Sequence, residues 1–175
     1  KNRLLNAKIV GNLQVELEMG KPLFSYEDIP LSKTINPADV TLEINNKKFT
    51  SGFCVNVGNP HIIFFVKNCF EHDLKTIGPK IENHDLFPEK TNVTMAQIID
   101  ENNITVNVWE RGAGLTKACG TAACATAIAA LKNKLARNKV DIKFNQGSLN
   151  IKIDKADNIF MTGPVSNVKK IELEI

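Results

Sequence analysis

The residue types around Cys119 are those that could carry out acid–base chemistry. A loop over 110–114 begins with Glu-Arg-Gly, and Gly120 and Thr121 follow the cysteine where a helix is predicted to start. N–H groups in the first turn of a helix lack intrahelical partners and carry a partial positive charge, so they bind carboxylates and favour a thiolate. The pattern predicts that the Cys119 thiol titrates below an ordinary cysteine. A cysteine beside alanines is also typical of a small core residue, and both interpretations stay open here.

Further polar residues stand directly before predicted strands. The segment 58–61 (Gly-Asn-Pro-His) leads into an apolar strand, and Asn92 precedes another. The proline fixes the backbone at that point, so we expect His61 at the mouth of its strand. Taken singly, His61 also suits a hydrogen-bonded structural residue, and Asn92 suits a turn. The charged pair at 110–111 also suits a solvated ion pair.

The cysteines and histidines do not follow a metal-binding pattern. The four cysteines, at 54, 69, 119 and 124, include no CxxC pair, and the three histidines are scattered along the chain. We therefore expect neither a zinc site, nor another metal site, nor a disulfide framework. Cys54, Cys69 and Cys124 are interpreted as packing residues.

Charge and hydropathy argue against two classes of partner. The formal charge is +3, with acids and bases interspersed, whereas nucleic-acid-binding domains usually carry a concentrated basic stripe. No apolar run is long enough to cross a bilayer, and no signal peptide is recognised at the start. We expect a cytoplasmic protein that acts on a small molecule, with no nucleic-acid or membrane partner.

Two kinds of pattern must position these residues. Segments with alternating or continuous apolar residues predict strands at 6–10, 13–18, 39–44, 47–56, 62–66, 93–99, 103–109, 139–144, 148–153 and 158–161. A short helix is predicted at 71–77, ended by Gly78-Pro79. A second helix, from Ala118 to about Leu135, has almost no polar face and should be buried on all sides. The expected fold class is α+β: a curved, mostly antiparallel sheet wrapped around a central buried helix.

Six motifs occur in order along the chain and carry a family resemblance. They are Met-Gly-Lys-Pro at 19–22, Gly-Asn-Pro-His at 58–61, Phe-Pro-Glu-Lys-Thr-Asn at 87–92, Trp-Glu-Arg-Gly-Ala-Gly at 109–114, Ala-Cys-Gly-Thr-Ala-Ala-Cys-Ala at 118–125 and Met-Thr-Gly-Pro at 161–164. Together they closely resemble the diaminopimelate epimerase family over essentially the whole chain. The resemblance implies an isomerase that interconverts LL- and meso-diaminopimelate for lysine and peptidoglycan synthesis, without pyridoxal phosphate or another cofactor.

The same resemblance implies a role for each candidate residue. Members of the family use two cysteines, one removing the α-proton and the other returning a proton to the opposite face of the carbon. Cys119 matches the second of these cysteines, and Ala122 stands where the usual pattern has glycine. The resemblance implies that Gly120 and Thr121 bind the substrate α-carboxylate and that Arg111 binds the distal carboxylate. Further implied substrate contacts are Asn59, Asn92 and Glu110. His61 and Glu110 also resemble the pair that tunes the thiols.

The family's first cysteine has no counterpart here. It lies in a Cys-Gly-Asn-Gly segment of an N-terminal domain, and this chain, which opens on Lys1, contains no such segment. The resemblance therefore implies edge strands from the inter-domain region at 1–24, a C-terminal epimerase domain at 25–165, and a terminal strand at 166–175 that returns to the missing domain. We expect the isolated chain to be inactive, and the family suggests a homodimer.

Two other interpretations remain open from the sequence. The chain could be an inactive, truncated domain that binds a ligand or partner without turnover, since one cysteine is missing. It could also belong to a racemase or epimerase of another amino acid in the same superfamily. Arg111, together with Asn59 and Asn92, argues against proline as that substrate, because proline has no distal carboxylate.

Overall fold

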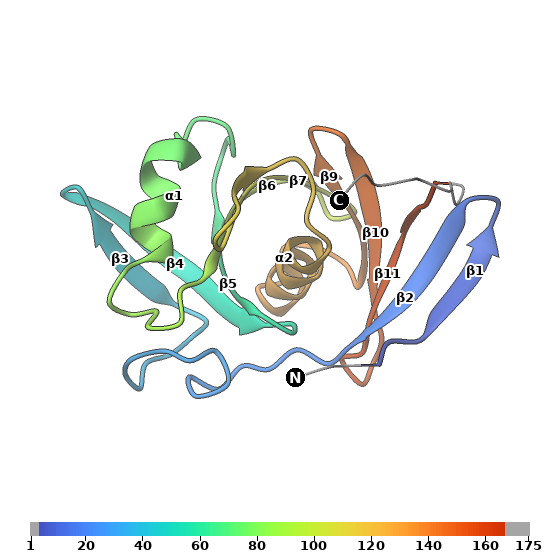
Figure 1. Ribbon diagram of the computed structural model, residues 1–175, viewed down its shortest axis with the longest axis horizontal. Helices are drawn as coiled ribbons and strands as arrows, with labels where there is room; N and C mark the ends of the chain where they lie inside the picture. The colour runs from blue at the N-terminus through green and yellow to red at the C-terminus, as the bar shows by residue number, and fades with distance from the viewer. Residues whose placement is uncertain (1–3, 167–175) are drawn as a thin grey trace, which may run out of the picture.

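The computed structural model describes residues 4–166 as one extended sheet with two helices (Figure 1). The strands are β1 (Ala7–Gly11), β2 (Gln14–Gly20), β3 (Val40–Ile44), β4 (Lys47–Asn56), β5 (Pro60–Phe65), β6 (Asn92–Asp100), β7 (Asn103–Glu110), β8 (Gly114–Thr116), β9 (Lys139–Phe144), β10 (Gly147–Ile153) and β11 (Ile159–Pro164). The helices are α1 (Leu74–Glu82) and α2 (Gly120–Lys132). The terminal strand predicted at 166–175 lies almost entirely outside the described residues.

The strands follow the order β1-β2-β11-β10-β9-β7-β6-β5-β4-β3, with β8 paired to β7 beside this path. Neighbours are antiparallel except for β5 with β6 and β7 with β9, which are parallel. The mixed α+β class with a mostly antiparallel sheet is therefore confirmed. The hairpin between β3 and β4 turns at Asn45 and Asn46, which both have positive φ, as the tight turn expected there requires.

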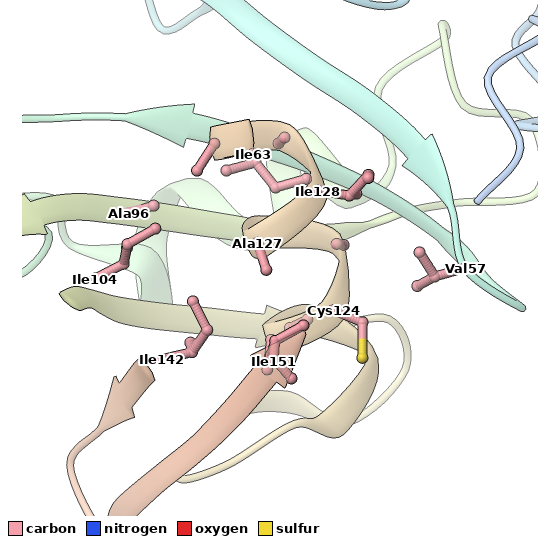
Figure 2. Close-up of a cluster of buried hydrophobic side chains, with 14 of the residues drawn as sticks. Val57, Ile63, Ala96, Ile104, Cys124, Ala127, Ile128, Ile142 and Ile151 are labelled. Carbon is pink, nitrogen blue, oxygen red and sulfur yellow. The ribbon is translucent and has the colours of Figure 1, made fainter. Parts of the chain in front are cut away.

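Helix α2 is buried along nearly its whole length. Every residue from Ala122 to Ala130 is buried, and the helix contacts β4, β5, β6, β9, β10 and β11. Figure 2 shows Cys124, Ala127 and Ile128 of this helix packed among Ile63, Ile142 and Ile151 of the strands. Small alanine side chains allow this close approach from several sides. The predicted helix was too long at both ends, because Cys119 is the cap before its first turn and Asn133 the cap after its last.

Strand β5 lies between two cores, as its continuous apolar run predicts. Ile63 packs in the core around α2, whereas Ile62 and Phe64 pack in a second core toward α1. Successive side chains of a strand point to opposite faces, so the positions that contact these two cores, 62 to 64, are all apolar. His61, which precedes them in β5, is a buried polar residue.

The helix predicted at 71–77 is present, but both of its predicted ends were wrong. The helix does not end before Gly78-Pro79 but runs from Leu74 to Glu82 with Pro79 inside it. The side chain of Asp73 caps its start by accepting from Lys75 N at 3.1 Å. Burial of Leu74 and Ile81 on one face outweighs the hydrogen bond that a proline cannot donate. This extension matters because it adds Gly78 and Glu82 to the helix.

The short strand β8 was also missed. Its three residues, Gly114–Thr116, are too few to show alternation, and they are strand only because they pair with the end of β7. In the described range 4–166, no helix is long and apolar enough to cross a membrane.

Replacing Ile128 with alanine tests the dependence of the fold on α2. The side chain is fully buried in the core around the helix, so its loss should lower the free energy of unfolding by about 2–5 kcal/mol. The matched control is Lys143→Ala on the exposed side of β9. This substitution should change the free energy of unfolding by less than about 0.5 kcal/mol. Urea denaturation followed by circular dichroism measures both, and equal midpoints would contradict the packing described.

Candidate functional site

Cys119 occupies the cap position at the start of α2. Its backbone is extended, with φ −149° and ψ 114°, and its side chain is 8% exposed. Sγ lies 3.5 Å from the hydroxyl oxygen of Thr121. The thiol therefore lies where the helix, buried from 122 to 130, reaches the edge of the core.

Burial raises the pKa of the Cys119 thiol above its ordinary value. Hydrogen bonds from the Thr121 side chain and the Ala122 backbone act in the opposite direction, whereas the neighbouring Glu110 carboxylate raises the pKa further. The prediction of a thiol that titrates low is therefore wrong for this chain. The helix start does favour the thiolate, but the loss of water around the sulfur has the larger effect.

Gly120 brings the last described strand against the start of α2. A Cβ at this position would lie 3.0 Å from the sulfur of Met161 in β11, so the glycine permits a close approach that alanine would not. Met161 of the Met-Thr-Gly-Pro segment and Gly120, next to Cys119, thus meet although they are 41 positions apart in the chain.

A tight turn between β7 and β8 carries Glu110 and Arg111. Glu110 pairs with Gly114 across the turn, and Ala113 N donates to Glu110 O at 3.0 Å. Gly112 has a φ of +76°, a conformation that favours glycine. This geometry brings the Glu110 carboxylate to the thiol of Cys119.

Asn92 ties that turn to the first residue of β5. Its Nδ2 donates to Pro60 O at 2.7 Å, and its Oδ1 accepts from Arg111 N at 2.9 Å. The side chain is almost completely buried. Sequence reasoning offered a turn residue or a substrate contact, and the structure gives this amide a direct part in placing Arg111.

His61 is fully buried and close to Asn59. Its Nε2 lies 2.9 Å from Asn59 Oδ1, an acceptor, which places the ring proton on Nε2. Burial, assisted by the positive charge of Arg111, lowers the pKa of His61 to about 3, so the ring is neutral at physiological pH. Nδ1 has no hydrogen-bond partner within residues 4–166.

Arg111 and Asn59 line the same surface groove, which has a volume of about 740 Å³. The guanidinium donates from Nη1 to Glu89 O at 2.8 Å, which leaves further N–H groups for a ligand. Gly58, Asn59 and Pro60 form one wall of the groove, with Glu89 and Arg111 from two other loops. Cys119, Gly120 and Thr121 are not among its lining residues.

The predicted residues thus form two connected groups. Glu110 and Thr121 both neighbour Cys119. In the other group, Asn92 bonds the Arg111 backbone, Asn59 shares its groove, and His61 feels its charge. A separate hollow of about 570 Å³, lined in part by Phe24, Cys54 and Lys132, contains none of them. Among the described residues, no cluster of three His, Cys, Asp or Glu side chains could hold a metal ion.

One residue of this region was missed. Glu82 accepts from Trp109 Nε1 at 2.6 Å and from Gly112 N at 3.1 Å. The spacing of Gly78 and Glu82 could have indicated a shared helix face. The predicted helix ended at 77, before both residues, so their spacing could not be interpreted as a shared face.

The fold of this chain is similar to that of two solved structures described as epimerases. The chain is similar to a predicted epimerase from Pseudomonas aeruginosa (TM-score 0.59, 16% identity, 97% of this chain and 62% of that chain). It is also similar to a hydroxyproline epimerase from Agrobacterium vitis (TM-score 0.58, 10% identity, 86% of this chain and 49% of that chain). At these identities the likeness shows the fold alone.

Sequence comparison is more specific. A family model described as diaminopimelate epimerase matches residues 53–168. A diaminopimelate epimerase from Pelagibacter ubique is 56% identical to this chain over 98% of this chain's length. One from a Wolbachia of Brugia malayi is 43% identical over 93% of this chain's length. The chain belongs to the diaminopimelate epimerase family. It spans 64% and 62% of the length of these two relatives.

Substitutions of two neighbours of Cys119 should change the reactivity of its thiol in opposite directions. Glu110→Gln removes the carboxylate that raises the pKa of Cys119, so alkylation at about pH 8 should accelerate. Thr121→Val removes the hydrogen bond that lowers this pKa, so alkylation should slow, because the thiolate is the nucleophile. Mass spectrometry of the peptide that contains Cys119, after timed exposure to iodoacetamide, gives both rates.

The control for charge is Glu43→Gln, an exposed carboxylate in β3, which should leave the rate unchanged. Shifts of the same sign for Glu110→Gln and Thr121→Val would contradict the environment described for this thiol.

Proposed function

We propose that this chain supplies one half of a diaminopimelate epimerase site, with the sheet curved around α2 to form that half. The observation that carries the proposal is the position of Cys119, at the start of a buried helix and beside Glu110, in a chain that belongs to this family. The other half of the site would come from the part of the relatives that this chain does not span.

Inversion of a carbon centre needs an acid and a base on opposite faces. In the proposed reaction, a second cysteine, as thiolate, takes the α-proton of diaminopimelate. Cys119 gives its Sγ–H proton to the opposite face of the same carbon and becomes the thiolate. No electron is gained or lost overall, and the two sulfurs exchange protonation states. A raised pKa supports Cys119 as the protonated partner that starts this step.

The start of α2 suits the substrate α-carboxylate. N–H groups of Gly120 and Thr121 are in the first turn, where they have no intrahelical acceptor. Negative charge builds on the α-carboxylate as the α-proton leaves, and donors fixed in advance stabilise it best. His61 and Glu110 would tune the thiols, with His61 as a neutral ring rather than a cation.

Arg111 is the proposed partner of the distal carboxylate. A guanidinium can bind a carboxylate through two parallel N–H groups, and this one lines the groove together with Asn59. Asn92 already uses one hydrogen and one lone pair for Pro60 and Arg111. Its second hydrogen and second lone pair remain for a substrate contact.

The proposed domain organisation follows from the same assignment. Residues 25–165 would form the C-terminal epimerase domain, with 1–24 as edge strands from the inter-domain region and 166–175 as a segment that returns to the other domain. The homodimer and the cytoplasmic location stay predictions.

A chimera tests the two-cysteine proposal. The unmatched part of the Pelagibacter ubique relative is joined to this chain, and the isolated chain is assayed beside it. We expect the chimera to convert LL- to meso-diaminopimelate and the isolated chain to convert none. Cys119→Ala in the chimera should lower kcat by about 10²–10⁴-fold, as expected for loss of an acid–base group.

The matched control is Cys124→Ala, because Cys124 is buried inside α2 and should matter for stability alone. Inversion by the isolated chain would refute the two-cysteine assignment. Binding of diaminopimelate without turnover by a folded chimera would favour the alternative of a ligand-binding domain.

Arg111→Met separates diaminopimelate from amino acids that lack a distal carboxylate. In the chimera, this change should weaken diaminopimelate binding roughly 10–100-fold, the value of lost hydrogen bonds to a charged group. The affinity for a monocarboxylate analogue should change little. Inhibition constants measure both, and Arg137→Met, an exposed arginine paired with Glu101, is the control. Equal losses for the two ligands would favour a different amino-acid substrate.

A further inference from the structure

Glu82 is a buried carboxylate in an unfavourable position. It is 5% exposed and is the last residue of α1, where the negative end of the helix dipole disfavours an acidic side chain. Neither ion pair described within residues 4–166 includes it. Acidic residues are rarely buried without a compensating partner, so something other than helix stability must account for this one.

The partners of Glu82 are one N–H group near the end of β7 and one in the turn that follows it. Oε2 accepts from Trp109 Nε1 at 2.6 Å, and Oε1 accepts from Gly112 N at 3.1 Å. These donors stand immediately before and after Glu110 and Arg111 in the chain. One carboxylate therefore bridges both sides of the pair that carries the proposed chemistry.

Gly78 supports the same contact. It lies one helical turn before Glu82, and so on the same face of α1. A Cβ at Gly78 would come within 2.6 Å of two indole carbons of Trp109. Glycine inside a helix is unfavourable, but here it gives the ring room to lie flat enough on α1 for its N–H to reach Glu82.

Asn92 completes the support from the other side. Its Oδ1 accepts from Arg111 N at 2.9 Å, so consecutive backbone N–H groups, of Arg111 and Gly112, are held by side chains from β6 and α1. With both fixed, the turn has one arrangement, in which Arg111 reaches the groove and Glu110 reaches Cys119.

We infer that Glu82 is a positioning residue that clamps the turn through Trp109 and Gly112 and thereby orients Glu110 and Arg111. It touches neither thiol nor groove and acts through the turn. A carboxylate is required because it offers an acceptor oxygen to each of the two donors, whereas a glutamine amide offers an acceptor to one and a donor to the other. The link to catalysis rests on the proposed function, but the clamp itself does not.

The test is Glu82→Gln in the 175-residue chain. Trp109 is the one tryptophan of the sequence, so intrinsic fluorescence reports on the clamp directly. We expect the emission to move to longer wavelength and exchange of the Gly112 amide, measured by NMR, to accelerate roughly 10–100-fold as its charged acceptor is lost. Glu71→Gln, an exposed carboxylate just before α1, should change neither.

The same variants in the epimerase chimera test positioning. Misplacement of Arg111 and Glu110 by Glu82→Gln should lower kcat/KM by roughly tenfold or more, with both KM and kcat affected, because one group binds and the other tunes the thiol. Glu71→Gln should retain the parent kinetics.

Each outcome separates the two proposals. Unchanged emission and Gly112 exchange in Glu82→Gln would overturn the clamp, whatever the chimera does. Altered emission and exchange with parent kinetics would overturn the positioning role. A parent chimera without activity would count against the proposed function alone. If Glu82→Gln fails to fold, Trp109→Phe removes one donor only, and unchanged Gly112 exchange together with unchanged kinetics would again overturn the inference.

Discussion

The burial of α2 on all sides is the constraint on which the rest of the structure depends. Six strands contact this helix, and its residues from 122 to 130 have no access to water. Strands can approach so closely because six of the nine residues from 122 to 130 are alanine. The helix therefore reaches the edge of the core at its ends, and its start, with Cys119, is the place where free backbone N–H groups and a thiol come together.

The loops around that helix start are fixed by buried polar side chains. Asn92 joins the start of β5 to Arg111, and Glu82 joins α1 to the turn after β7. Buried polar groups of this kind are costly unless every partner is present. The bonds that Asn92 and Glu82 make to Arg111 N and Gly112 N therefore fix the turn between β7 and β8.

Burial also sets the charge state of the region. It raises the pKa of Cys119 and lowers that of His61 to about 3, and both shifts favour the uncharged form. Glu110 is then the anionic neighbour of a neutral thiol, and Arg111 the cation beside a neutral imidazole. Desolvation exceeds the field of the helix start at Cys119, because the sulfur is surrounded mainly by protein rather than by water.

The sequence by itself determined the fold class, the buried helix, most strand positions and the membership of a family. These follow from local patterns: strand alternation, the continuous apolar run of β5, the absence of a polar face on α2, and ordered motifs.

The tertiary structure decided what depends on distant partners. Pro79 stays inside α1 because Leu74 and Ile81 are buried against other elements, and β8 exists through its pairing with β7. The pKa of Cys119 follows from the protein packed around it rather than from the helix start alone. Glu82 acquires its partners only when α1 and the turn after β7 meet, since hydrogen bonds between segments 27 residues apart leave no periodicity in the sequence.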